Sequence, residues 1–469
     1  MPRILVISDL HISAGALDDC DRELEEALVR FLAYASSVGD DRELVINGDF
    51  LDFVQAPPAE GRALEDEAVD PHTTRKEPVC FTERQSLVKL RAMVAAHSPI
   101  FNALGGFLRA RTGNRITLLP GNHDPDFFWP LVRREFAEAV SGGNVTVHLE
   151  RAYHPAACPE VHIEHGQQFD PINGFYIDGK ERWSEANPPI LPCGEEPRLY
   201  ECLGTRFLIR YLNSLDAKYP FVDNVKPFGR FLKLFGASAL HPEFGAMQAG
   251  LALFAMLRFL GKMSVTRPKD LLGIEAVKDE ARPALIEKLK AMRRTRPGPF
   301  KQLSNSWPGD RNLGVLLDDA AWHERILEWC AENAQLFDAG QERDAGTYLS
   351  AGGGGGNYLS LGVGFSVDES AQLINGAAGI LKNPAVKLVV MGHTHDPQRR
   401  PGGLNYFNTG CWTRYYRFGG DNDAKPWSIL TKESNHSYVR FPYELNYMEI
   451  DPRDAAAAEM KCFAMKDHD

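Results

Sequence analysis

Acidic, histidine and amide side chains recur directly behind short apolar runs of this sequence. Carboxylate, imidazole and amide groups together suit Mn, Fe, Zn or Co, whereas a calcium site would use oxygen ligands alone. Ten such groups follow five apolar runs, and they could hold two metal ions with one shared carboxylate. In chain order they are Asp9 and His11, Asp49 and Asp52, Asn122, His123 and Asp124, His165, and His393 and His395.

Local spacing within these groups favours ligation of a common ion. Alternate side chains of an extended segment point the same way, so Asp9 would face the same side as His11. The same holds for His393 and His395. Neighbouring glycines, which permit sharp turns, stand beside Asp49, Asn122, His165 and His393. Taken alone, the stretch LLPGNHDPDF (118–127) also fits an ordinary Gly-Asn turn with solvated polar groups.

Strands that alternate with helices position these candidate residues. Apolar residues at helical spacing predict helices over 21–37 and 368–383. Short apolar runs predict strands at 3–8, 43–47, 115–120, 145–149, 160–165 and 386–392. This alternation indicates an α/β sheet. Residues just past the carboxyl ends of strands in such a sheet converge on one crevice, so we expect the candidate groups to share one site.

The order of the polar blocks resembles that of the calcineurin-like metallophosphoesterase superfamily. The family pattern runs D-x-H, GD, GNH followed by an acidic residue, a His next to Gly, and GHTH. This chain has DLH, GD, GNHD, HG and GHTH in that order. Each short block is weak evidence alone, but five in the family's order, each closing a predicted strand, are specific. The resemblance covers 1 to about 171 and 366 to 450, and it implies a four-layer α/β/β/α sandwich.

The family pattern also implies a role for each residue. One ion would be held by Asp9, His11, Asp49 and His395. The other would be held by Asp49, Asn122, His165 and His393, so that Asp49 bridges the two. Manganese is the expected metal, with Fe, Zn or Co as alternatives. A hydroxide that bridges the ions would attack phosphorus in line.

His123 is not a ligand in the family pattern. The resemblance implies that it faces the substrate phosphate, helped by Asp124 in a His–Asp contact. There it would stabilise charge or protonate the leaving oxygen.

The sequence departs from two branches of the family. Where the tyrosinate-iron purple acid phosphatases have a Tyr three residues after the bridging Asp, this chain has Asp52. We therefore expect Asp52 to orient a ligand imidazole. After His165 the chain reads GQQFDP, without the acidic residue that follows HG in the UDP-diacylglucosamine pyrophosphatases. The resemblance to that branch is partial.

Three further positions are weighed as site residues. Within the strand at 160–165, His165 is favoured over His162 as the ligand because it stands at the strand end beside Gly166. Asn408 and Arg414 follow the GHTH strand, where the family often lines the pocket. They are candidate substrate contacts, and the alternative is that they belong to a turn and a solvated strand face.

The central part of the chain is expected to be a separate region. From 172 to 365 strand signals are few and helical patterns frequent, which predicts a mainly helical insertion that could cap the site. The five glycines at 352–356 would form a flexible connection. The catalytic domain would then comprise 1–171 and 366–450, with 451–469 as a C-terminal tail.

Composition limits the classes of partner. The chain of 469 residues has a formal net charge of -11, which argues against a general nucleic-acid binder. Its eight cysteines include no CxxC pair, and neither a signal peptide nor a membrane-spanning run is expected, so we predict a cytoplasmic protein. The sequence leaves the oligomeric state open.

The residues thus predict a dinuclear metal-dependent phosphohydrolase that cleaves a phosphoester or pyrophosphate bond of a small phosphorylated substrate. One alternative is a lipid-linked or nucleotide-linked pyrophosphatase or phosphodiesterase. In that case the apolar segment 249–263 would form a hydrophobic cap, and the basic segment 288–301 would contact anionic head groups. The alternative outside enzymes is a binding scaffold that keeps the fold and has lost the chemistry.

Overall fold

A computed structural model of the chain describes residues 2–56, 81–141, 143–170, 369–417 and 441–464, with shorter stretches between 173 and 351. The chain divides into two compact units. The first comprises Met1–Lys226, Glu369–Gly419 and Thr431–Asp469, and the second comprises Pro227–Asp368 and Gly420–Leu430. Every candidate site residue lies in the first unit.

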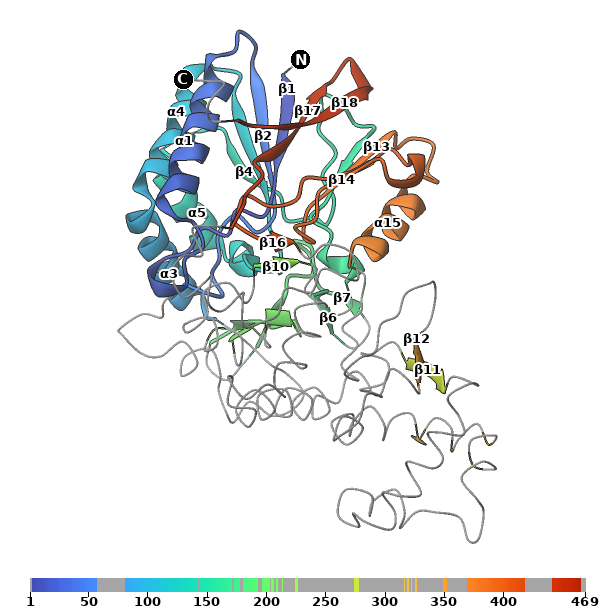
Figure 1. Cartoon of the computed structure of the whole chain (residues 1–469). Coiled ribbons are helices and arrows are strands. Elements are labelled where there is room, and N and C mark those ends of the chain that lie inside the picture. Colours follow the sequence, from blue (N-terminus) through green and yellow to red (C-terminus); the bar gives the residue numbers. More distant parts are fainter. Residues whose placement is uncertain are drawn as a thin grey trace. The chain divides into compact units, whose positions relative to one another are not determined.

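A six-stranded sheet forms the centre of the first unit (Figure 1). Its parallel strands are β1 (Arg3–Ile7), β2 (Arg42–Asn47), β3 (Arg115–Leu119) and β4 (Val145–Val147). β17 (Asn446–Asp451) pairs with β1 antiparallel, and β18 (Asp454–Cys462) pairs antiparallel with β17 at the edge. The strand order is β18-β17-β1-β2-β3-β4, so the first strand of the chain is central.

A second sheet of four strands has the order β14-β15-β13-β5. β13 (Leu388–Met391) lies parallel to both β5 (Val161–Ile163) and β15 (Tyr406–Asn408). β14 (Gln398–Arg399) pairs with β15 antiparallel. The two sheets together contain all five strands behind which the sequence places its polar groups.

Helices cover the outer faces of the two sheets (Figure 1). α1 (Arg22–Ser37), α3 (Glu83–Ala96), α4 (Ser98–Ala110) and α5 (Pro130–Ala139) lie on the outer face of the six-stranded sheet. α15 (Glu369–Ile380) lies on the outer side of the four-stranded sheet. The short 3-10 helices are η1 (Gly15–Leu17), η3 (Pro125–Phe128), η4 (Gln167–Phe169) and η10 (Pro401–Gly403).

Alternating side chains of β1 show how the layers pack. Leu5 and Ile7 join the apolar cluster beneath the four helices, whereas Ile4 and Val6 join the cluster between the two sheets. A third cluster joins Leu373 of α15 to the far face of the second sheet. Burying each such aliphatic side chain contributes about 1.5–3 kcal/mol. The predicted α/β class with four α/β/β/α layers is confirmed.

Side-chain caps mark the starts of α1 and α3. Asp21 caps α1 by accepting hydrogen bonds from the backbone amides of Glu23 and Leu24. Thr82 and Gln85 form a reciprocal capping box at the start of α3. These caps satisfy backbone amides of the first helical turn, which have no carbonyl partner within the helix.

Two predictions about the chain's organisation need correction. The residues expected to form a tail include β18, which pairs along most of β17. The first described part of the expected helical insertion contains short antiparallel strand pairs and lies in the first unit. These pairs are β6 (Tyr176–Ile177) with β7 (Lys180–Glu181), and β8 (Ile190–Leu191) with β9 (Arg198–Leu199). Strands of two residues carry too little alternation to be read from sequence.

Little of the remaining central segment can be described. β10 (Val225–Lys226) pairs parallel with β16 (Tyr416–Arg417) in the first unit. In the second unit β11 (Ile274–Val277) pairs antiparallel with β12 (Leu349–Ala351). The apolar segment 249–263, the basic segment 288–301 and the glycines 352–356 lie outside the described residues.

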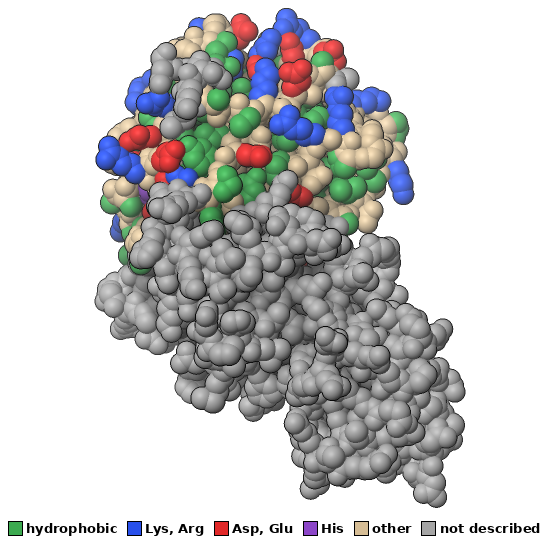
Figure 2. Space-filling view, viewed as in Figure 1, with side chains coloured by type: hydrophobic (Ala, Val, Ile, Leu, Met, Phe, Trp, Pro, Cys, Tyr) green, Lys and Arg blue, Asp and Glu red, His purple; other side chains and the backbone are tan. Residues whose placement is uncertain are grey.

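The described surface carries charges of both signs. On the face shown in Figure 2, Lys and Arg side chains are interspersed with Asp and Glu over the described part of the first unit. None of the helices that the structure describes combines the length and apolar character needed to span a bilayer.

Candidate metal centre

The candidate ligands lie on loops at the carboxyl ends of five parallel strands. β1, β2 and β3 of the first sheet lead into the DLH, GD and GNHD loops. β5 and β13 of the second sheet lead into the HG and GHTH loops. The DLH loop runs along the GD loop, because the amides of Leu10 and His11 both donate to the Asp49 carbonyl. The sheet edges therefore bring the loops together, as the sequence predicts.

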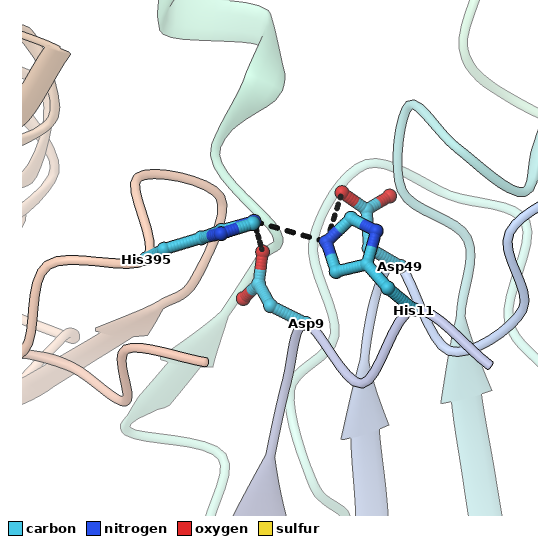
Figure 3. A group of neighbouring side chains, drawn as sticks. All are labelled: Asp9, His11, Asp49 and His395. Atoms are coloured by element: carbon cyan, nitrogen blue, oxygen red, sulfur yellow. Dashed lines mark hydrogen bonds and ion pairs between the residues drawn. The ribbon is translucent and has the colours of Figure 1, made fainter. Parts of the chain in front are cut away.

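A first group of ligands comprises Asp9, His11, Asp49 and His395 (Figure 3). One ligand atom from each residue lies within 4.8 Å of the others. The Nε2 atoms of His11 and His395 are 2.9 Å apart, and His395 Nε2 lies 3.3 Å from Asp9 Oδ1. These side chains point toward one another from β1, β2 and β13.

A second group comprises Asp49, His165 and His393, again within 4.8 Å. His165 Nε2 lies 3.1 Å from Asp49 Oδ2, and both side chains are only 1% exposed. The rival candidate His162 instead contacts Glu164, at 3.0 Å. Asp49 is thus common to these two groups, at the position expected of a bridging ligand, whereas a third group joins His11, Asp52 and His123 without it.

Unsatisfied atoms in the second group fit a bound cation. His165 Nδ1 donates to the Asn47 carbonyl at 2.8 Å, which leaves a lone pair on Nε2 beside the Asp49 carboxylate. His165 Nε2 and Asn122 Oδ1 are both buried without a hydrogen-bond partner. Such atoms are expensive to bury unless they gain a partner. A divalent cation would provide that partner for both atoms.

Left-handed backbone marks the ligand positions. Of the seven non-glycine residues with positive φ in the described parts of the chain, five are candidate ligands. They are Asp9 (φ 54°), His11 (47°), Asp49 (50°), His393 (71°) and His395 (55°). Each such conformation costs on the order of 1–3 kcal/mol and persists only where the surroundings fix it. Four of these five residues, Asp9, His11, Asp49 and His395, belong to one group of neighbouring ligand atoms.

Glycines make room for the same side chains. A Cβ at Gly121 would overlap the carboxylate and backbone nitrogen of Asp49, and one at Gly48 would overlap the His165 ring. A Cβ at Gly392 would overlap Asp9 and Ser8. The glycines of GD, GNHD and GHTH are therefore required for close approach between neighbouring loops.

Electrostatics inside the cluster favour ionised carboxylates. Burial acts to raise the pKa of Asp49, but the adjacent His165, His123 and His11 hold it well below its usual range. Burial acts to lower the pKa of His165, but Asp49 and Asp9 raise it to about 9. A cation bound here would replace the proton on this imidazole.

The partner of His123 differs from the prediction. His123 Nδ1 lies 2.7 Å from Asp52 Oδ2, so Asp52 rather than Asp124 makes the His–Asp contact. The same Asp52 oxygen lies 3.1 Å from His11 Nδ1. Burial opposes the charged form of His123, but Asp52 and Asp49 raise its pKa to about 10. Asp52 thus orients one ligand imidazole, as expected, and also the imidazole expected to face phosphate.

Asp124 holds the loops together instead. Its carboxylate accepts hydrogen bonds from the backbone amides of Phe50, Leu51 and Gly121. These bonds join the GD loop to the GNHD loop. Burial and the nearby Asp49 charge raise the pKa of Asp124 to about 7. Sequence reasoning erred because adjacency in the chain does not decide which carboxylate reaches an imidazole.

The two candidate substrate contacts, Asn408 and Arg414, hydrogen-bond to other protein groups instead. Arg414 is 3% exposed, and its guanidinium donates to Asp21 and Glu23 at 2.5 Å each. Asn408 is fully buried, and its amide donates to the Gly392 carbonyl at 2.6 Å. Asn408 therefore fixes the GHTH loop, and Arg414 fixes the start of α1.

One contact had no signal among the sequence motifs. His393 Nε2 lies 3.1 Å from Asp170 Oδ2, and Asp170 is 1% exposed. Asp170 ends η4, four residues after the glycine of the HG block. The only hint in the sequence is an acidic residue shortly behind that block.

The strand ends of the two sheets thus bring together carboxylates and imidazoles in groups that could hold metal ions. Residues 2–219 match the family model described as calcineurin-like phosphoesterase. This part of the chain, just under half of its length, is similar to that superfamily. The matched region includes the DLH, GD, GNHD and HG loops, and the GHTH loop follows it in the chain. Comparisons with curated proteins and with solved structures found no match.

Proposed function

We propose that the chain is a dinuclear metal-dependent phosphohydrolase that cleaves a phosphoester or pyrophosphate bond. The observation that carries this proposal is the sharing of Asp49 by two separate groups of metal-capable side chains. A single structural ion would need only one such group. Two groups with one carboxylate in common are suited to a pair of ions that act on one substrate.

The residues divide between the two ions as the family pattern implies. Asp9, His11, Asp49 and His395 would hold one ion. Asp49, Asn122, His165 and His393 would hold the other, with Asn122 contributing its buried and unpaired amide oxygen. When bound, two divalent ions would make a water molecule nucleophilic at neutral pH and neutralise charge on a phosphate. Manganese is the first metal to test, followed by Fe, Zn and Co.

His123 would donate the proton that the leaving oxygen needs. Its Nδ1 is committed to Asp52, so Nε2 is the nitrogen left for substrate. Its side chain is 16% exposed while Asp52 is fully buried, so the imidazole is the part of this pair that a substrate can reach. The raised pKa of His123 keeps a proton on the ring, which suits donation to a leaving oxygen.

The proposal is tested by metal analysis and turnover on the purified full chain. We expect about two transition-metal ions per chain and hydrolysis of an activated aryl phosphomonoester or phosphodiester. A screen of nucleotide-linked and lipid-linked pyrophosphates with the same preparation would identify the bond class. Failure to bind or turn over with any of Mn, Fe, Co and Zn would contradict the proposal and favour a binding scaffold.

The variant His123→Gln separates binding from chemistry. We expect kcat to fall about 10²–10⁴-fold, because a positioned general acid contributes that much. The metal content should stay at two ions, because His123 is not a ligand in either group expected to hold them. Loss of metal from this variant would show that its role has been misassigned.

A further inference from the structure

Asp170 has no place in the reaction proposed above, yet its carboxylate touches a ligand imidazole. It is 1% exposed, and its Oδ2 lies 3.1 Å from His393 Nε2. The same oxygen accepts a 2.6 Å hydrogen bond from the Asn173 side chain. A buried carboxylate that accepts from two polar side chains is a fixed element of the structure rather than a solvated group.

The contact determines which nitrogen of His393 faces the metal group. An ionised carboxylate can only accept hydrogen bonds, so Nε2 of His393 carries the proton that Asp170 accepts. Nδ1 is then unprotonated and presents its lone pair as the ligand atom. His393 also stands in left-handed backbone, and its amide donates to Asp9 at 3.0 Å. The backbone and the ring of His393 are therefore each held by a different carboxylate.

Asp170 also connects two ligand loops of the second group. Its own amide donates to the Gln167 carbonyl at 3.0 Å within the turn that follows His165 and Gly166. The Gly392 amide donates to the His165 carbonyl at 2.9 Å. The HG and GHTH loops are thus joined twice, once through backbone and once through the Asp170 side chain.

We propose that Asp170 is a positioning residue for the metal ion held by Asp49, Asn122, His165 and His393. It fixes the tautomer and the ring orientation of His393 and so sets the affinity of that ion. The inference rests on the dinuclear function proposed above. The first group of ligands uses a different support, because His11 is oriented by Asp52.

The test compares metal binding by the wild-type full chain and by Asp170→Asn. We would titrate the metal-free proteins with Mn²⁺ by equilibrium dialysis and check their folding by circular dichroism. The variant should bind one of its two ions about 10–100-fold more weakly, the usual effect of losing such a partner. The other ion should keep its wild-type affinity. At limiting Mn²⁺ the variant should therefore hold one ion where the wild type holds two.

Two further variants separate this role from a purely structural one. Asn173→Ala removes a second side chain that hydrogen-bonds Asp170 and should leave both affinities unchanged. Glu164→Gln is the matched control. It alters another carboxylate–imidazole pair, Glu164 with His162, at the end of β5. It should bind Mn²⁺ as the wild type does. Co²⁺ absorption spectra of Asp170→Asn should change for one ion only, which a general loss of stability would not produce.

The outcomes distinguish this inference from the function on which it rests. If the wild type binds two ions and Asp170→Asn binds both with unchanged affinity, the role of Asp170 is wrong and the dinuclear proposal stands. Equal weakening of both ions, or equal effects of Asp170→Asn and Glu164→Gln, would also overturn it. If the wild type binds no pair of ions, the proposed function itself fails.

Discussion

The two ligand groups around Asp49 are built by different means. In the first group, Asp9, His11, Asp49 and His395 all have left-handed backbone. In the second, Asn122 and His165 do not, and glycines beside them provide the space for close approach. All four ligands of the first group therefore have strained backbone, whereas only Asp49 and His393 do in the second; glycines make room for ligands in both.

The supports behind the imidazoles differ as well. His11 is held by the Asp52 carboxylate, His165 by the Asn47 carbonyl, and His393 by the Asp170 carboxylate. Only Asp52 also reaches His123. For the proposed pair of ions, we therefore expect that each ion can be weakened alone through its own support, whereas a change at Asp49 would affect both.

The largest effect is expected from Asp49→Asn. An amide lacks the charge that two cations share, so both ions should be lost from metal analysis. Turnover should fall at least as far as the loss of about 10²–10⁴-fold expected when a general acid is removed. Asp126→Asn is the matched control, because Asp126 is a 1% exposed carboxylate that hydrogen-bonds Ser86. If Asp49→Asn kept one tightly bound ion, this would contradict the proposal that Asp49 is a ligand of both ions.

An intermediate effect is expected from Asp52→Asn. It should weaken one ion about 10–100-fold through His11 and leave the other ion unchanged, which is the reverse of Asp170→Asn. It should also lower kcat nearly to that of His123→Gln, because it removes the partner of His123. The double variant should then be little slower than either single one, since the two residues act as a unit. Equal weakening of both ions would contradict separate supports.

The smallest effects are expected from alanine at the glycines. Gly392→Ala crowds Asp9 and should weaken the first group, whereas Gly48→Ala crowds His165 and should weaken the second. Gly48 also has φ +83°, so its replacement should lower the free energy of unfolding by about 1–3 kcal/mol. Gly39→Ala meets nothing within 4 Å and is the control. Mn²⁺ titration of all three variants would show which ion each one weakens. Chemical unfolding would measure the change in the free energy of unfolding.

Much of the framework was readable from sequence because its signals are local. Apolar runs marked β1, β2, β3, β5 and β13, and helical spacing marked α1. The ligand blocks follow these strands, so parallel pairing alone brings them together. Long periodic segments and motifs at strand ends can be recognised without knowing which distant residues they contact.

What the sequence did not reveal depends on contacts between distant residues. Asp124 is next to His123 in the chain, yet Asp52, 71 positions away, is the carboxylate that meets it. Asp124 instead accepts from backbone amides of the two loops. Asp170 reaches His393 across 223 positions. Arg414 was a candidate substrate contact, but Asp21 and Glu23 neutralise it from the start of α1. Such pairings follow from tertiary packing, which local patterns do not encode.

The position of β1 has a consequence for how the protein is made. Its partners on the two sides are β2 and β17, and β17 begins only at Asn446. A ribosome adding about 5–20 residues per second therefore exposes β1 with one open edge for at least about 20 seconds before β17 emerges. His393 and His395 emerge late as well, so the nascent chain cannot assemble either ligand group in full until synthesis is nearly finished. The proposed metal binding would consequently be a late event, and until β17 emerges the open edge of β1 needs protection from aggregation.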